Sequence, residues 1–205
     1  MKNPMKQSLP KGFTLVELLV VIAIIAVLAA AGFAGGKAAM NKAKKVTAQA
    51  TATSIAANIE SFYSDYSALP GGDESDSTVY NTTSEAGLAI LNILAAQDDN
   101  EENTRGIRYL TVKDAKSSGN PRDGATYNTN NEITGLYDPW GEPYYFQMDS
   151  DYDESLIVTP GSSGSGSNIT VQMSDSTLRG KRSAVWSLGT DEGGEADAST
   201  IARTW

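Results

Sequence analysis

Residues 13–36 read FTLVELLVVIAIIAVLAAAGFAGG, an almost continuously apolar run that only Glu17 interrupts with a charge. About 20 such residues in a helix suffice to cross the hydrocarbon core of a bilayer. Residues 1–12 precede the run with three lysines and two prolines and show no helical pattern. Since positive charge precedes the run and an acidic chain follows it, the positive-inside rule leaves residues 1–12 in the cytoplasm and the rest outside. We therefore expect a leader at 1–12 and a membrane-embedded helix at 13–36.

A helical pattern continues through residues 37–70. Apolar residues recur there at the spacings of an amphipathic helix, at Ala39, Ala43, Val46 and Ala50 and then at Ala52, Ile55, Ile59, Phe62 and Tyr66. We expect one long helix from about Phe13 to Tyr66, ended by Pro70 and the glycine that follows it. Three glycines interrupt it and each costs about 1 kcal/mol of helix propensity, so the helix can bend or melt at Gly32, Gly35 and Gly36.

Residues 71–205 have the pattern of a small globular domain. A short helix is expected at about 85–96, with Thr83 or Ser84 as its N-cap and with an inward face made of Leu88, Leu91, Leu94 and Ala95. Clusters of Gly, Pro, Asn and Asp separate five strand-like segments, at 107–112, 144–148, 155–159, 169–173 and 184–188. The fold class we expect is α+β, a long N-terminal helix packed on a small antiparallel sheet.

Composition excludes several classes of function. The formal net charge is -9, and binding of nucleic acid needs a basic surface, so no nucleic-acid partner is expected. The chain has no cysteine and no histidine. It therefore lacks disulfides, the commonest general base, the usual nucleophile pairs and the imidazole ligands of zinc. The sequence predicts that the chain is not an enzyme.

The segment Gly12-Phe13-Thr14-Leu15-Val16-Glu17, with a lysine before it and the apolar run after it, resembles the cleavage motif of type IV prepilins and pseudopilins. The resemblance implies that a prepilin peptidase cleaves between Gly12 and Phe13 and that Phe13 is then N-methylated. It also implies that Glu17, the fifth residue of the mature chain, acts in assembly by registering an incoming subunit in a filament.

The chemistry of Glu17 agrees with this role. An ionised carboxylate in a bilayer helix costs on the order of 2.5 to 3.5 kcal/mol on insertion scales, so it should have a partner. Cleavage creates one, because the free amine of Phe13 lies one helical turn from Glu17, in reach of the same or a neighbouring subunit. The structural alternative is a plain signal anchor that tolerates a glutamate.

Residues 135–145, GLYDPWGEPYY, resemble a segment of the major pseudopilin of type II secretion systems. Two prolines and a glycine around Trp140 predict a rigid turn whose indole covers the core at the edge of the sheet. We interpret it as a structural turn without chemistry.

The acidic loop 188–205 is similar to the C-terminal calcium loop of the same family. Calcium takes six to eight oxygen ligands from carboxylates and carbonyls in a flexible loop. By position, the resemblance implies a calcium site made of the Leu188 carbonyl and the acids Asp191, Glu195 and Asp197. Thr200 stands where the family usually has an aspartate. The calcium site can therefore be weakened, re-formed with Glu195, or lost, and these alternatives stay open. A solvated acidic loop that binds no calcium stays open as well.

A second acidic segment, Asp149-Ser150-Asp151-Tyr152-Asp153-Glu154, has alternating aspartates like a calcium loop. It fails as an EF-hand, since Glu154 replaces the glycine needed at the sixth position and Pro160 the glutamate needed at the twelfth. We interpret it as a solvated hairpin turn.

The resemblances together imply a subunit that polymerises into a type II secretion pseudopilus. Its expected partners are copies of itself, the prepilin peptidase, an inner-membrane assembly platform with its ATPase, minor pseudopilins, and membrane lipid before assembly. The expected location is a single pass through the inner membrane with a periplasmic C-terminal domain, and then a periplasmic filament. A type IV pilin for adhesion, motility or DNA uptake is the alternative in the same class, and a membrane-anchored periplasmic enzyme is the alternative from another class.

Overall fold

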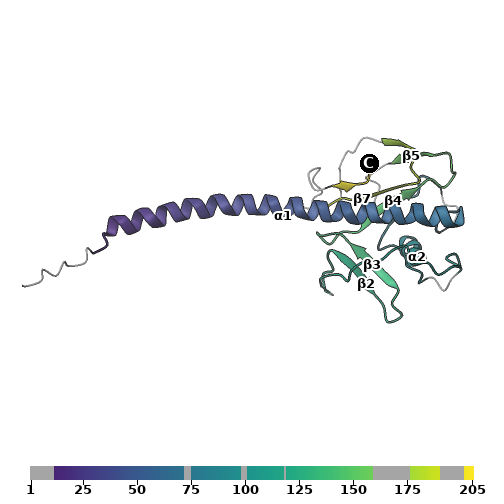
Figure 1. The fold of residues 1–205 in the computed structure, drawn as a ribbon, viewed down its shortest axis with the longest axis horizontal. Coiled ribbons are helices and arrows are strands. Elements are labelled where there is room, and N and C mark those ends of the chain that lie inside the picture. The colour runs from purple at the N-terminus through teal and green to yellow at the C-terminus, as the bar shows by residue number, and fades with distance from the viewer. Residues whose placement is uncertain (1–11, 72–74, 98–100, 118, 159–175, 190–200) are drawn as a thin grey trace, which may run out of the picture. The chain divides into compact units, whose positions relative to one another are not determined.

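The computed structural model describes residues 12–71, 75–97, 101–117, 119–158, 176–189 and 201–205, without the side chains of 31–35 and 176. The chain divides into two compact units, Met1–Met40 and Asn41–Trp205. Helix α1 (Leu15–Tyr66) runs through both units, and every strand and the second helix belong to the second unit. The described fold is α+β, as the sequence predicts (Figure 1).

Helix α1 is continuous through the three glycines, so local melting at Gly32, Gly35 or Gly36 is wrong for this structure. Alanine-rich flanks on both sides of the glycines offset their low propensity, because propensity acts as a sum over a window. The predicted end at Tyr66 is confirmed. Ser67 takes a left-handed φ of 55° and its N–H donates to the Tyr63 carbonyl at 2.7 Å, which closes the last turn.

The largest sheet has the order β1-β4-β7-β8 and is antiparallel throughout. Its strands are β1 (Tyr80–Asn81), β4 (Tyr144–Met148), β7 (Ser183–Ser187) and β8 (Ala202–Arg203). Strand β4 has the predicted bounds, and β7 lies one residue before its prediction. The sheet therefore joins segments from the beginning, middle and end of the domain.

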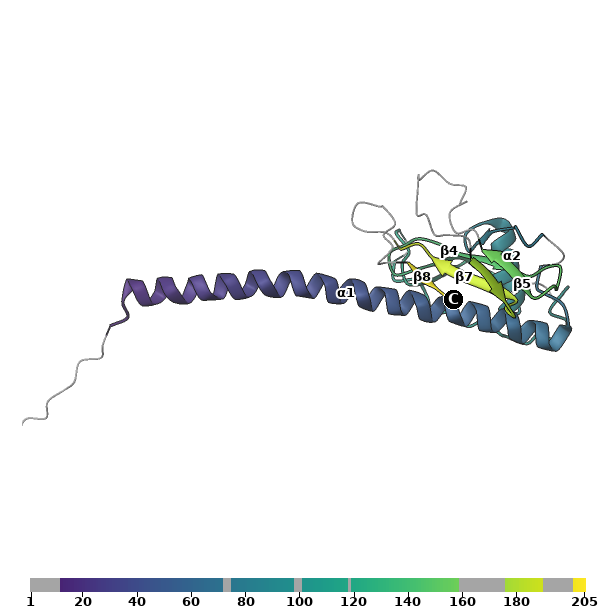
Figure 2. The same ribbon diagram turned by 90° about the horizontal axis from the view of Figure 1, so that it is seen from above.

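The α1 segment within the second unit covers one face of this sheet (Figure 2). Its buried line has spacings of four, three, four and three, through Ala48, Ala52, Ile55, Ile59 and Phe62. The expected line through Ala39, Ala43, Val46 and Ala50 is wrong, since all four side chains are exposed. The expected line from Ala52 through Ile55 and Ile59 to Phe62 is confirmed, because these side chains are buried on the sheet.

The other face of the sheet is covered by a hairpin of β5 (Ser155–Val158) and β6 (Ser176–Arg179). Because successive side chains of a strand point to opposite faces, β4 serves both layers. Tyr144, Phe146 and Met148 pack in the cluster with α1, whereas Tyr145 packs in the cluster with the hairpin. This explains why every residue of β4 is buried.

Helix α2 (Glu85–Leu94) follows β1 and begins at its predicted start. Ser84 is its N-cap, and the Ser84 side chain accepts a hydrogen bond from the Gly87 N–H. Beside it lies the hairpin of β2 (Gly124–Tyr127) and β3 (Ile133–Tyr137), two strands that were not predicted from the sequence. The Asn92 side chain connects the two, because its Oδ1 accepts from the Ile133 N–H at 2.7 Å and its Nδ2 donates to the Ile133 carbonyl at 3.2 Å.

One predicted strand is wrong and one lies outside the described residues. Residues 107–112 form no strand. Instead the N–H groups of Tyr109 and Leu110 both donate to the Leu94 carbonyl at 2.9 Å, so this apolar segment caps the end of α2. Residues 169–173 lie outside the described part of the chain.

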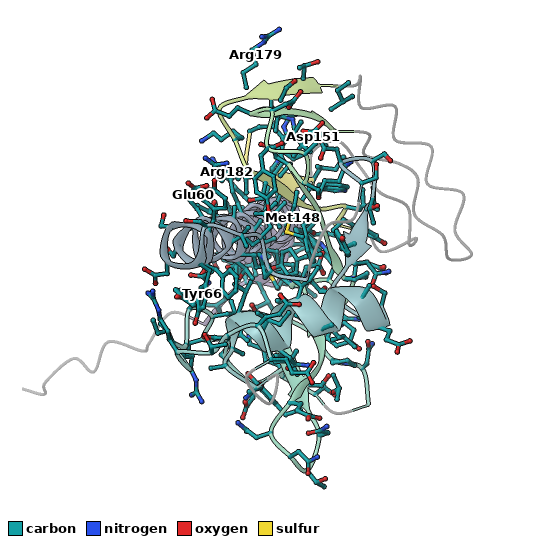
Figure 3. The ribbon with its side chains drawn as sticks, turned by 90° about the vertical axis from the view of Figure 1, so that its right-hand side faces the viewer. Glu60, Tyr66, Met148, Asp151, Arg179 and Arg182 are labelled. Atoms are coloured by element: carbon teal, nitrogen blue, oxygen red, sulfur yellow. The ribbon has the colours of Figure 1, made fainter. Side chains whose placement is uncertain are left out.

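A cation also fastens α1 to the turn between β6 and β7. The Arg182 Nε lies 3.6 Å from Glu60 Oε1, and its guanidinium lies 3.7 Å from the centre of the Tyr63 ring. Figure 3 shows Arg182 and Glu60 next to each other. The β-rich part of the domain is thus held to the helix by charge as well as by the apolar core.

Candidate functional site

Helix α1 begins with a capping box made by Thr14 and Glu17. The Thr14 N–H and hydroxyl both donate to Glu17 Oε2, at 2.8 and 2.7 Å, and the Glu17 N–H donates to Thr14 Oγ1 at 3.2 Å. A threonine N-cap with glutamate three residues later satisfies donors at the helix start reciprocally. This local role of Glu17 was not predicted from the sequence, although a T-x-x-E pattern before an apolar run indicates a capping box.

The cap leaves part of the Glu17 carboxylate available. Both bonds from Thr14 go to Oε2, and among the described residues Oε1 accepts no hydrogen bond. An acceptor oxygen at the very start of a helix can therefore still receive a donor from outside the helix. An amine of the same or another chain is one such donor.

Gly12 and Phe13, the residues on either side of the predicted cleavage point, are exposed and precede the helix without regular structure. A methyl group added at Gly12 would meet nothing within 4 Å, so the described fold gives no steric reason for glycine there. A requirement for glycine at this position would come from another protein that recognises Gly12. Exposure on both sides of the bond also leaves the junction accessible to a peptidase.

The first half of α1 presents an unusual apolar surface. Phe13 is 76% exposed and Leu15 78%, and large apolar side chains at least 45% exposed continue to Val27 and Leu28. Contiguous apolar surface of this kind indicates contact with lipid or protein. No helix in the described part of the chain combines the length and apolarity needed to cross a membrane. The membrane span at 13–36 stays a prediction.

The Asp-Pro-Trp-Gly turn is built around one buried carboxylate. Asp138 Oδ1 accepts from the N–H groups of Trp140, Gly141 and Glu142 at 2.8, 2.8 and 2.9 Å. Its Oδ2 accepts a short hydrogen bond from the Ser187 hydroxyl on β7. The predicted structural turn is present, and Trp140 is half-buried against the core as expected. The sequence pattern alone did not indicate that Asp138 ties the turn to the sheet.

The C-terminal site can be followed only at its two ends. Leu188 is buried directly after β7, and the chain returns through β8, which pairs with β7, to Trp205 packed edge-on against Trp186. Asp191, Glu195 and Asp197, the acids expected to bind calcium with Leu188, lie outside the described residues. Calcium in this loop stays a prediction.

Comparison with known proteins gives a single local match. The family model of the prokaryotic N-terminal methylation motif matches residues 9–33, which contain Gly12, Phe13 and Glu17. Comparisons with curated proteins and with solved structures return no match. The matched motif covers the junction, the cap and most of the exposed apolar helix. It supports a type IV pilin-like precursor, processed and polymerised as such subunits are, and it points to a structural subunit rather than an enzyme.

Proposed function

We propose that this chain is a subunit of a type II secretion pseudopilus, which polymerises through the first half of α1 and drives protein export across the outer membrane. The observation that carries the proposal is the arrangement at the helix start. An exposed Gly12-Phe13 junction precedes a carboxylate that keeps one oxygen free, and an exposed apolar helix follows. Each of these features has a use in an assembling subunit.

Cleavage before Phe13 would change the chemistry at this end. It turns a neutral peptide nitrogen into an amine beside Glu17, at the low dielectric of a bilayer or of packed helices, where opposite charges interact strongly. An incoming subunit whose amine meets the free Glu17 oxygen of its neighbour gains an ion pair that a misregistered subunit lacks. The apolar helices would then pack on one another and leave the lipid.

Mass spectrometry of the protein extracted from membranes tests the first step. In cells with an active prepilin peptidase, the mass should correspond to a chain that starts at Phe13 and carries one added methyl group. An intact residue 1–12 segment in such cells would refute the proposal.

Two features favour a secretion pseudopilus over a surface pilus. The segment 135–145 has the Asp-Pro-Trp-Gly pattern of the major pseudopilin, and the chain has no cysteine with which to fasten its C-terminus as many pilins do. We also propose a calcium ion bound by the loop around Leu188, Asp191, Glu195 and Asp197. Deleting the gene should then stop secretion of enzymes to the medium and leave twitching motility and DNA uptake unchanged. The reverse result would assign the chain to a type IV pilus.

A further inference from the structure

Four aspartates from two distant segments meet at the corner between β4 and β5. One carboxylate oxygen from each of Asp76, Asp149, Asp151 and Asp153 lies within 4.8 Å of the other three. Asp149, Asp151 and Asp153 follow β4 directly, and Asp76 comes from the segment before β1. These residues are called the four-aspartate cluster below. Figure 3 shows Asp151 on the side of the domain that carries the β6 residue Arg179.

Backbone hydrogen bonds fix the cluster. Asp76 Oδ1 accepts from the N–H groups of Ser150 and Asp151 at 2.6 and 3.1 Å, a contact between residues 74 and 75 positions apart in sequence. The Asp153 N–H donates to Asp151 Oδ1 at 3.1 Å. Each of these bonds holds the side chain of Asp76 or Asp151 in place.

Asp149 is the member that needs a partner. It is fully buried, and its Oδ1 has no hydrogen-bond partner among the described residues. Its Oδ2 accepts from the Glu154 N–H at 3.1 Å. A buried acceptor without a partner is uncommon in native structures and costs about 1–3 kcal/mol when the group is neutral, and more when it is charged.

The charges around Asp149 make the cost larger. Burial raises the pKa of Asp149, and the three neighbouring carboxylates raise it further. The hydrogen bond from the Glu154 N–H lowers this pKa but does not outweigh them. Within the described part of the chain, no lysine or arginine forms an ion pair with any of the four aspartates. The cluster thus gathers four carboxylates, and no positive side chain from the described residues is paired with them.

The backbone at Glu154 takes a left-handed conformation. An EF-hand loop requires glycine at its sixth position for a sharp turn. Here Glu154 holds the sixth position and takes the left-handed conformation itself, with φ of 60°. An EF-hand was rejected from the sequence because of this glutamate and because of Pro160 at the twelfth position. The Glu154 side chain does not prevent the turn, and Pro160 lies outside the described residues. The segment is not the hairpin turn that we expected, since β4 pairs with β1 and β7 rather than with β5. Its residues 151–154 are exposed, as a solvated turn predicts, and Asp149 is the buried exception.

We propose that the four-aspartate cluster binds one calcium ion. Only oxygen ligands are present, which suits a hard cation and not zinc or copper. Magnesium is bound through one or two carboxylates at about 2.0–2.1 Å in strict octahedral geometry, whereas calcium accepts several carboxylates at about 2.3–2.6 Å. Opposite ligands of calcium lie about 4.6–5.2 Å apart, which agrees with the 4.8 Å limit of the cluster.

The ion would fasten the segment before β1 to the corner after β4. This site is distinct from the calcium proposed for the C-terminal loop, and it does not depend on polymerisation. In a chain without cysteine it would do for the β1–β4 side of the sheet what a disulfide does in other exported domains. It would also supply the missing partner of Asp149 Oδ1.

The test uses the full-length chain in detergent, with calcium or EDTA, and reads the melting temperature. Asp191→Asn, Glu195→Gln and Asp197→Asn are first introduced together, so that the C-terminal loop cannot contribute. In this background calcium at about a hundredfold excess over its Kd should raise the melting temperature by about 5–10 °C, and magnesium by less. No rise with calcium would overturn the proposal.

Two further variants assign the effect to the cluster. The double variant Asp151→Asn with Asp153→Asn should abolish the rise, because it removes two of the carboxylate charges that would bind the ion. Asparagine keeps the oxygens that accept the N–H groups of Asp153 and Ser155, so only the charge is lost. Both side chains are exposed, so little else changes. The matched control replaces two exposed acids outside the cluster, Glu101→Gln with Asp114→Asn, and should retain the rise.

Asp76→Asn is the second, independent variant. Asp76 belongs to the other segment of the cluster. Calorimetric titration should show one calcium ion bound per background chain, and Asp76→Asn in that background should bind calcium at least tenfold more weakly. Equal calcium affinity in the background and in Asp76→Asn contradicts the site, as does an undiminished rise in melting temperature when Asp151 and Asp153 are replaced.

Discussion

Replacing Asp138 by alanine removes the acceptor of four donors at once. The donors are the N–H groups of Trp140, Gly141 and Glu142 and the hydroxyl of Ser187. Asp138 is fully buried, so water does not readily take over these bonds. The substitution would therefore loosen the Asp-Pro-Trp-Gly turn and its attachment to β7 together.

The magnitude follows from which donors keep a partner. The Gly141 N–H still has the Asp138 backbone carbonyl at 3.1 Å, and the Ser187 hydroxyl can rotate. The N–H groups of Trp140 and Glu142 lose the acceptor that the structure gives them, at about 1–3 kcal/mol for each buried donor. We expect a loss of about 3 kcal/mol in the free energy of unfolding, a large part of the roughly 5–15 kcal/mol that a domain has.

Asp138→Asn is the matched variant. Its Oδ1 can keep the three backbone bonds, and only the bond to Ser187 must be rearranged, so the expected loss is about 1 kcal/mol. Urea unfolding of both variants measures the difference, and in thermal unfolding the alanine variant should melt about 6–12 °C lower than the wild-type chain. A loss below about 1 kcal/mol in the alanine variant, or equal losses in both, would refute the account of the turn.

Three further predictions test other parts of the structure. Glu154→Gly should raise the free energy of unfolding by about 0.5 kcal/mol, measured by urea unfolding, because Glu154 has a φ of 60° that glycine adopts without strain. Burial raises the pKa of Asp123, but the hydrogen bonds and charges of Lys113 and Lys116, each 2.7 Å away, outweigh it and leave that pKa below its ordinary value. Asp123 therefore stabilises the fold above about pH 4 and loses this contribution as the pH falls through its folded pKa, so Asp123→Asn should cost about 0.5–1 kcal/mol at pH 7 and progressively less as the pH falls below about 4. Gly12→Val should leave the melting temperature unchanged and block removal of residues 1–12, read by mass spectrometry, and normal processing would contradict it.

The parts of the fold with a strong periodic signal could be predicted from the sequence. The end of α1 at Tyr66, the start of α2 after Ser84 and the bounds of β4 all agree with the structure. In each case the local pattern and the tertiary packing favour the same conformation. The buried face of α1 was predicted from Ala52 to Phe62, but before it the pattern could not distinguish Val46, which is 61% exposed, from the buried Ala48.

The unpredicted elements depend on partners far away in the sequence. The apolar segment at Tyr109 and Leu110 alternates like a strand, but its N–H groups bond to the end of α2, and no local pattern reports that choice. The approach of Asp76 to Asp149 has the same cause, because it follows from the pairing of β1 with β4. At the N-terminus, by contrast, the motif is local, and both the junction and the charge at Glu17 were visible in the sequence.

The central claim is that the free carboxylate charge of Glu17 registers subunits in a filament. Glu17→Gln is the sharpest perturbation, because glutamine can still accept from Thr14 and preserve the capping box while the charge is lost. Electron microscopy of cells that produce the chain with its assembly ATPase and prepilin peptidase should show filaments for the wild-type chain. Glu17→Gln should be processed and stable in the membrane and form no filaments, whereas filaments in wild-type number from this variant would contradict the account.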